Sequence, residues 1–273
     1  MSGIPQKLSA PYPMVRVINR QLGPFYEGPV FIWDVDKTYL DTRFSQLKNL
    51  LKIPFEFGVD KKAIPGTVEL LKGLRDGPAG SEYRPLFFVS ASPPQIRRSV
   101  EKKMLLDGVD FDGITYKNPG AVLRRLQFDQ LKEQVAFKLS ALLLLFAELP
   151  VGARLHLCGD NVEKDPHIYG LFARVVSGVC AGEDLHNKLM AHGVRKQYAS
   201  NVVALAQTVE KRHCVDGIYI HNVRRLATEM NEDQGAPLLW DKATDLAHSL
   251  LDAGLLSPQW FEQVESATSQ FPE

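Results

Sequence analysis

The chain has 273 residues, of which 45% are hydrophobic, so it can bury one sizeable core. Its 32 Lys and Arg residues equal its 32 Asp and Glu residues, which argues against binding to nucleic acid or an anionic membrane through overall charge. The three cysteines have no CxxC spacing, which argues against a disulfide framework or a zinc site and favours an intracellular setting.

The N-terminal 29 residues contain five prolines and little periodicity. They predict an extended lead-in, with a short edge strand at residues 14–18. This segment has no apolar run of the kind found in signal peptides. The most apolar stretch, residues 139–147, is far shorter than the about 20 residues that a membrane-spanning helix needs. We therefore expect a cytoplasmic protein in which that stretch is a buried helix.

An apolar run at residues 30–33 predicts a buried strand of a parallel sheet. It ends in the sequence DVDKT, which places Asp34 and Asp36 two residues apart at the carboxyl end of the strand. Ligands of open α/β sheets bind at this end, and the period of a strand starts both side chains on one face. The alternative is that both are turn-forming aspartates.

Strands and helices then alternate along the chain, which predicts an α/β fold with a doubly wound parallel sheet. The insert at residues 43–62 has room for a small flap or minimal cap only. We divide the chain into a lead-in (1–29), a core (30–182) and a helical C-terminal extension (183–273). The predicted core helices are 64–75, 94–107, 122–149 and 165–172, and the later strands are 85–89, 111–116, 155–158 and 174–179. The predicted helices of the extension are 185–192, 197–213, 216–230, 238–253 and 258–267.

Four polar sites fall at the predicted strand ends or at a helix start that faces them. After the DxD pair, Ser90 follows the second buried strand. Lys138 precedes the apolar helical run, and Asp160 and Asp165 follow the strand at 155–158. The order is therefore DxD, Ser, Lys and GDxxxxD.

This ordered set resembles the haloacid-dehalogenase-like (HAD) superfamily of phosphohydrolases over about residues 30–180. Pro65-Gly66, the segment FVSASP at 88–93 and the segment GDNVEKDPHIY at 159–169 are similar to the catalytic domain of the actin-patch phosphatidate phosphatase group. That group, like the lipins, dephosphorylates phosphatidic acid with Mg²⁺. Two features depart from it: Lys37 stands where the group tends to carry a second acidic residue, and its β-rich accessory segments are missing.

The resemblance implies a role for each polar residue. Asp34 would be the nucleophile that forms an aspartyl-phosphate, and Asp36 would protonate the leaving oxygen and then activate water. Ser90 and Lys138 would hold the transferring phosphoryl oxygens. Mg²⁺ would supply the positive charge that lets a carboxylate attack a phosphate dianion. The implied metal residues are Asp34, Asp36 (through its backbone carbonyl), Asp160 and Asp165, the last of which would orient the metal shell or Lys138.

Each residue also has a structural alternative. Ser90 could cap the next helix, and Asp165 could be an N-cap. Lys138 could be a surface lysine, and Lys117, at the end of the third predicted strand, is its rival as the phosphate-binding residue.

The set as a whole predicts a Mg²⁺-dependent phosphatase, with an open site that suits a bulky substrate such as phosphatidic acid. A phosphorylated protein or metabolite is the other substrate class that we consider. We expect no nucleic-acid partner, and a basic helical face at residues 97–103 is compatible with peripheral membrane contact. The alternative function is a catalytically silent module that binds lipid or protein, and the intact pair Asp34 and Asp36 argues against it.

Overall fold

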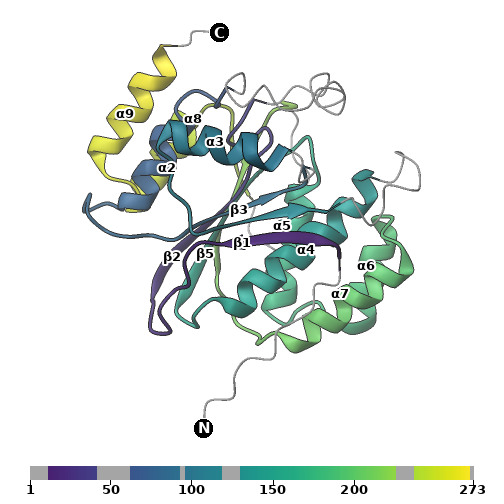
Figure 1. Cartoon of the computed structure of the whole chain (residues 1–273). Coiled ribbons are helices and arrows are strands. Elements are labelled where there is room, and N and C mark those ends of the chain that lie inside the picture. Colours follow the sequence, from purple (N-terminus) through teal and green to yellow (C-terminus); the bar gives the residue numbers. More distant parts are fainter. Residues whose placement is uncertain (1–11, 42–61, 93–95, 119–129, 226–236, 271–273) are drawn as a thin grey trace.

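The protein forms a seven-stranded sheet in the strand order β1-β4-β3-β2-β5-β6-β7, with helices on both faces (Figure 1). This computed structural model describes residues 12–41, 62–92, 96–118, 130–225 and 237–270. Edge strand β1 runs antiparallel to β4, and the other strand pairs are parallel. The strands are β1 (Met14–Ile18), β2 (Gly28–Asp34), β3 (Leu86–Ser90), β4 (Gly113–Lys117), β5 (Ala153–Asp160), β6 (Val215–His221) and β7 (Leu238–Trp240).

Strand β2 lies at the centre of the sheet, as its unbroken apolar run predicts. Its last five residues are all buried, and it pairs in parallel with β3 on one side and β5 on the other. The carboxyl ends of these three strands therefore lie side by side. As predicted, Asp34, Ser90 and Asp160 are the last residues of β2, β3 and β5.

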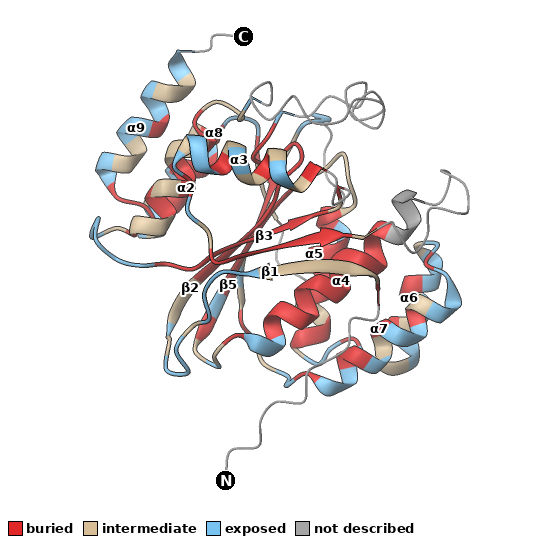
Figure 2. Cartoon of the chain, in the orientation of Figure 1, coloured by how far each residue is buried: buried red, intermediate tan, exposed pale blue. Residues whose placement is uncertain are grey.

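The helices form two layers, each with its own hydrophobic core (Figure 2). Helices α4, α5, α6 and α7 cover one face, and α2, α3, α8 and α9 cover the other. Helix α4 is buried against the sheet, which explains why residues 141–146 are all apolar. The bounds are α2 (Thr67–Asp76), α3 (Arg97–Asp107), α4 (Gln130–Glu148), α5 (Asp165–Val176), α6 (Gly182–Ala191), α7 (Lys196–Thr208), α8 (Ala243–Asp252) and α9 (Pro258–Ser269).

Two predicted elements are wrong. The predicted strand at 174–179 is the end of helix α5 and the turn after it: two β-branched residues, Val175 and Val176, resemble a strand but are buried on one side of the helix. The predicted helix at 216–230 is strand β6 as far as His221. Its apolar run Ile218-Tyr219-Ile220 is buried by pairing with β5, and that pairing outweighs local propensity.

We had expected a wholly helical C-terminal region, and this prediction is wrong. Strands β6 and β7 extend the sheet of the core, and the predicted segment 238–253 divides into β7 and α8. The sheet therefore continues with strands that follow residue 182, the predicted end of the core. The lead-in also contributes to the fold, because the predicted edge strand at 14–18 is confirmed as β1.

Some predictions fall on residues outside the described ranges. The predicted flap at 43–62 coincides almost entirely with residues 42–61, and the predicted helix start at 122 lies within 119–129. Of the helices within the described ranges, none has the length and apolar character needed to cross a bilayer.

Candidate active site

The loop after β2 holds the first two carboxylates in a tight turn. Asp34 is fully buried, and Asp36 is 5% exposed. The amides of Tyr39 and Leu40 both donate to the carbonyl of Val35, which closes the turn. The turn brings the acidic pair to the sheet edge at which β3 and β5 also end.

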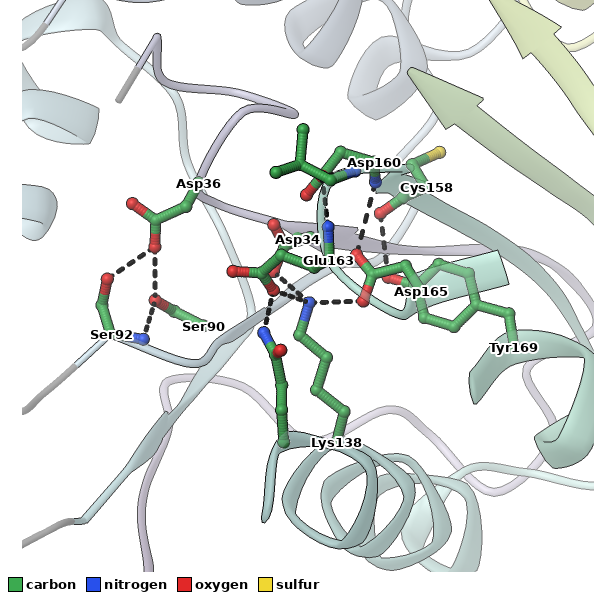
Figure 3. Close-up of polar contacts among 12 residues, drawn as sticks. Asp34, Asp36, Ser90, Ser92, Lys138, Cys158, Asp160, Glu163, Asp165 and Tyr169 are labelled. Atoms are coloured by element: carbon green, nitrogen blue, oxygen red, sulfur yellow. Dashed lines mark hydrogen bonds and ion pairs between the residues drawn. The ribbon is translucent and has the colours of Figure 1, made fainter. Parts of the chain in front are cut away.

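Lys138 projects from α4 into the same space and contacts three carboxylates (Figure 3). Its Nζ lies 2.8 Å from Asp34 Oδ1, 2.5 Å from Asp165 Oδ1 and 2.9 Å from Glu163 Oε2. The side chain is fully buried, so it is not the surface lysine of the structural alternative. We had expected Lys138 at the start of a helix, but it lies well inside α4. Its long side chain reaches the strand ends.

The loop between β5 and α5 holds Asp160, Glu163 and Asp165 in place. Asp160 Oδ1 accepts hydrogen bonds from the amides of Val162 and Glu163, at 2.6 and 2.9 Å. Asp165 Oδ2 accepts from the amide of Asp160 at 3.3 Å. Asp165 therefore connects the end of β5 to Lys138.

The carboxylate cluster, defined as Asp34, Asp160, Glu163 and Asp165, carries an excess of negative charge. One oxygen from each residue lies within 4.8 Å of the others, and Lys138 is the cation in contact with three of them. Asp34 Oδ2 and Asp160 Oδ2 are buried and have no hydrogen-bond partner among the described residues. Buried anionic oxygens without a partner are costly, and a hard divalent cation with oxygen ligands would satisfy both. The residues present therefore fit a divalent metal.

The pKa values of these groups reflect the same excess of charge. Burial raises the pKa of Asp34 well above its usual value, although Lys138 opposes the shift. Burial also raises the pKa of both Asp160 and Asp165 to about 6. Burial acts to lower the pKa of Lys138, but the neighbouring carboxylates outweigh it and raise that pKa well above its usual value. The ammonium is therefore charged at neutral pH, whereas the carboxylates lack enough positive charge around them.

Asp36 points away from the carboxylate cluster toward two serines (Figure 3). Ser92 Oγ donates to Asp36 Oδ2 at 2.5 Å, and Ser90 Oγ lies 3.4 Å from the same oxygen. Ser90 Oγ also accepts from the amide of Ser92 at 3.2 Å, so the serines form one hydrogen-bonded unit with Asp36. Within the ranges that the structure describes, Asp36 Oδ1 is buried and has no hydrogen-bond partner.

The structure thus brings the sequence-predicted residues to one edge of the sheet in two neighbouring groups. It also places Glu163 and Ser92 there, to which the sequence reasoning gave no role, although both lie within the two segments that carry the resemblance. The rival lysine, Lys117, lies at the end of β4 near the ring of Tyr12, at 5.7 Å from its centroid. Burial lowers the pKa of Lys117 to about 8.

Comparison with known proteins identifies the family. Residues 30–181, more than half of the chain, match the family model described as phosphatidate phosphatase APP1, catalytic domain. The chain belongs to this family. The predicted relationship to HAD-like phosphatases is thereby confirmed, and the protein is a phosphatase.

The other two comparisons add little. The chain is similar to the crystal structure of a Mesorhizobium loti protein assigned as a HAD-like phosphatase, with 12% identity and a TM-score of 0.44. That match covers 95% of this chain and 98% of the other, but the likeness is too low to decide fold or function. A search of the curated proteins gave no match.

Proposed function

We propose that this phosphatase is a Mg²⁺-dependent phosphomonoester hydrolase that acts through an aspartyl-phosphate on Asp34. One observation carries the proposal: Lys138 holds Oδ1 of the buried Asp34, and Asp34 Oδ2, within the carboxylate cluster, has no hydrogen-bond partner in the part of the chain that the structure describes. This arrangement leaves Oδ2 available to a metal, while Lys138 holds Oδ1, the oxygen that would attack phosphorus. Asp34, Asp160 and Glu163 would hold the metal, which would supply positive charge at the phosphoryl group.

The first step uses Asp34 as the nucleophile. A carboxylate oxygen forms a bond to phosphorus while the bond from phosphorus to the alcohol oxygen breaks. Lys138 is placed to neutralise charge on the phosphoryl oxygens, because its ammonium lies 2.8 Å from Asp34 Oδ1. Ser90, at the end of β3, would donate a hydrogen bond to the same group.

Asp36 would move the protons. It would donate a proton to the leaving alkoxide and then remove one from the water that attacks the phosphorus of the aspartyl-phosphate. That attack breaks the bond to Asp34 and releases inorganic phosphate. Two serine hydroxyls within 3.4 Å fix the Asp36 carboxylate, and its Oδ1 has no partner among the residues described, which supports a role in proton transfer.

For the substrate, we propose a lipid phosphate of the phosphatidic acid type. The support is the family, whose model is described as a phosphatidate phosphatase catalytic domain. The phosphate of phosphatidic acid is a monoester that can carry two negative charges, and Lys138 and a divalent metal would neutralise them.

The test measures phosphate release from phosphatidic acid in mixed micelles and from a generic aryl phosphate, with Mg²⁺ and with EDTA. We expect metal-dependent release from the wild type and none from Asp34→Asn. Release in EDTA would contradict the metal requirement, and turnover by Asp34→Asn would contradict the covalent mechanism. Hydrolysis of the aryl phosphate without hydrolysis of phosphatidic acid would contradict the lipid substrate alone.

A further inference from the structure

The last residue of β6 and the residues after it contact both loops that carry the candidate catalytic residues. This segment consists of His221, Asn222 and Arg224, which we call the β6 clamp. It lies outside residues 30–181, the region that matches the family model. Its contacts therefore concern a part of the chain for which the family gives no role.

His221 holds the loop after β2. Its Nδ1 lies 2.6 Å from the carbonyl oxygen of Lys37, and because a carbonyl only accepts, Nδ1 carries the hydrogen. Lys37 follows Asp36 and adopts a left-handed conformation with φ of 60°, which is uncommon for a residue other than glycine. The ring of His221 stacks on Trp240 of β7, with centroids 4.1 Å apart and planes at 13°. This packing fixes the direction in which the imidazole donates.

Asn222 and Arg224 hold the loop after β5. Asn161 Nδ2 donates to Asn222 Oδ1 at 2.7 Å, and Asn161 Oδ1 accepts from the amide of Arg224 at 3.0 Å. Arg224 Nη2 donates to the carbonyl oxygen of Val162 at 2.8 Å. Asn161 and Val162 directly follow Asp160, so these bonds fix the backbone that bears a carboxylate of the cluster.

The β6 clamp connects the two loops at the point where β2 and β5 no longer pair. The pairing of β2 with β5 ends at Trp33 and Cys158, before Asp34 and Asp160 are reached. Beyond that point the clamp connects the two loops through a third strand. The distance between the carboxylates of Asp34 and Asp160 depends on where those loops lie.

We propose that the β6 clamp positions the carboxylates of the active site for metal binding, so that the catalytic unit extends through β6 and β7. The inference rests on the proposed metal-dependent function. Residues of this kind, which orient ligands without touching the metal, typically change metal affinity or activity by about 10–100-fold when they are replaced.

The first test separates the hydrogen bond of His221 from its stacking. His221→Phe keeps an aromatic ring on Trp240 but has no donor for the Lys37 carbonyl. His221→Asn gives up the stacking but places an amide nitrogen close to the position of Nδ1. We expect His221→Phe to raise the Mg²⁺ concentration for half-maximal activity by about 10-fold or more. His221→Asn should keep this Mg²⁺ concentration close to that of the wild type. If His221 acted through packing alone, His221→Asn would be the more impaired of the two variants.

The second test uses Arg224, which is exposed, and Asn222, which is partly buried; neither belongs to the hydrophobic core. Arg224→Ala removes the bond to Val162, and Asn222→Ala removes the bond to Asn161. The matched control is Arg154→Ala, which breaks the contacts of Arg154 with Asp216 and the His213 carbonyl at the opposite end of the same strand pair. We expect the clamp variants to lose metal affinity, and the control to stay within about twofold of the wild type.

A second readout does not depend on turnover: the rise in melting temperature on addition of Mg²⁺ to the full-length protein. The clamp variants should show a smaller rise than the wild type at the same Mg²⁺ concentration, and Arg154→Ala an equal one. Equal shifts and equal Mg²⁺ dependence in all variants would overturn the inference. A wild type with neither metal-dependent stabilisation nor metal-dependent turnover would instead overturn the proposed function, so the two failures are distinguishable.

Discussion

Replacing Asp34 with asparagine should make the metal-free protein more stable while abolishing turnover. Asparagine has nearly the same shape, and its Oδ1 can still accept a hydrogen bond from Lys138. It removes one of four negative charges from a buried cluster whose carboxyl pKa values are raised, which means that the structure disfavours the charged form. The catalytic arrangement therefore costs stability until a cation is bound.

The magnitude follows from the distances. The ligand oxygens of the cluster lie within 4.8 Å of one another, and Lys138 Nζ lies 2.8 Å from Asp34 Oδ1. With an effective dielectric constant of about 20, the attraction is about 6 kcal/mol and each carboxylate repels Asp34 by at least about 3.5 kcal/mol. The repulsions exceed the attraction by roughly 4 kcal/mol. Protonation at neutral pH relieves part of this, so we expect a gain of about 1–2 kcal/mol, or roughly 3–6 °C in melting temperature.

The assay is thermal unfolding of the wild type and Asp34→Asn, each in EDTA and in excess Mg²⁺. The wild type should gain about 2.7 kcal/mol when Mg²⁺ is at 100 times its dissociation constant, and the variant should gain much less. Asp216→Asn, which removes a charge from an exposed ion pair with Arg154, is the control and should respond to Mg²⁺ as the wild type does. A variant less stable than the wild type in EDTA, or with the full response to Mg²⁺, would refute the reasoning.

Three further predictions test other parts of the site and the core. Lys138→Met should lower kcat by about 10²–10³-fold or more, and Lys117→Met should have a much smaller effect; the reverse order in steady-state kinetics would make Lys117 the phosphate-binding lysine. Gly159→Ala should lose activity, because a Cβ there would lie 2.4 Å from Asp165 Oδ2. Gly23→Ala is the control and should behave as the wild type, because none of the described residues has an atom within 4 Å of the new carbon. Burial lowers the pKa of His156 from 6.5 to about 4, so the folded state favours the neutral imidazole. The stability that this preference contributes is present above pH 6.5 and is lost as the pH falls from 6.5 toward 4. Chemical denaturation should show the stability of the wild type falling by about 2 kcal/mol relative to His156→Gln between about pH 7 and 5, and parallel pH profiles would contradict the low pKa.

The sequence was informative wherever a short apolar run stopped at a polar residue. The strand that ends at Asp34 and the strand that ends at Asp160 were both predictable, because a parallel sheet buries its strands on both faces. The order of the polar residues then placed Asp34, Lys138 and Asp165 together. Lys138 contacts both carboxylates, as that placement required.

Features that depend on tertiary contacts could not be predicted in the same way. Glu163 lies in a loop without periodicity, and only the reach of Lys138 from α4 shows that it joins the cluster. Strand β6 has a short apolar run that fits a helix or a strand equally well until its pairing with β5 is known. His221 could not be assigned to the site, because its contact with Lys37 spans 184 residues of sequence.

The most direct test of the central claim is to find the phosphoryl group on the protein during turnover. The enzyme, and an Asp36→Asn variant that lacks the base for the second step, would be mixed with substrate and Mg²⁺, quenched in acid and mapped by mass spectrometry. We predict a hydroxylamine-sensitive phosphoryl group on the peptide that contains Asp34, accumulating further in the Asp36→Asn variant because its second step lacks the base. A phosphoryl group on a different residue, or turnover by the wild type with none on Asp34 at any time, would contradict the account.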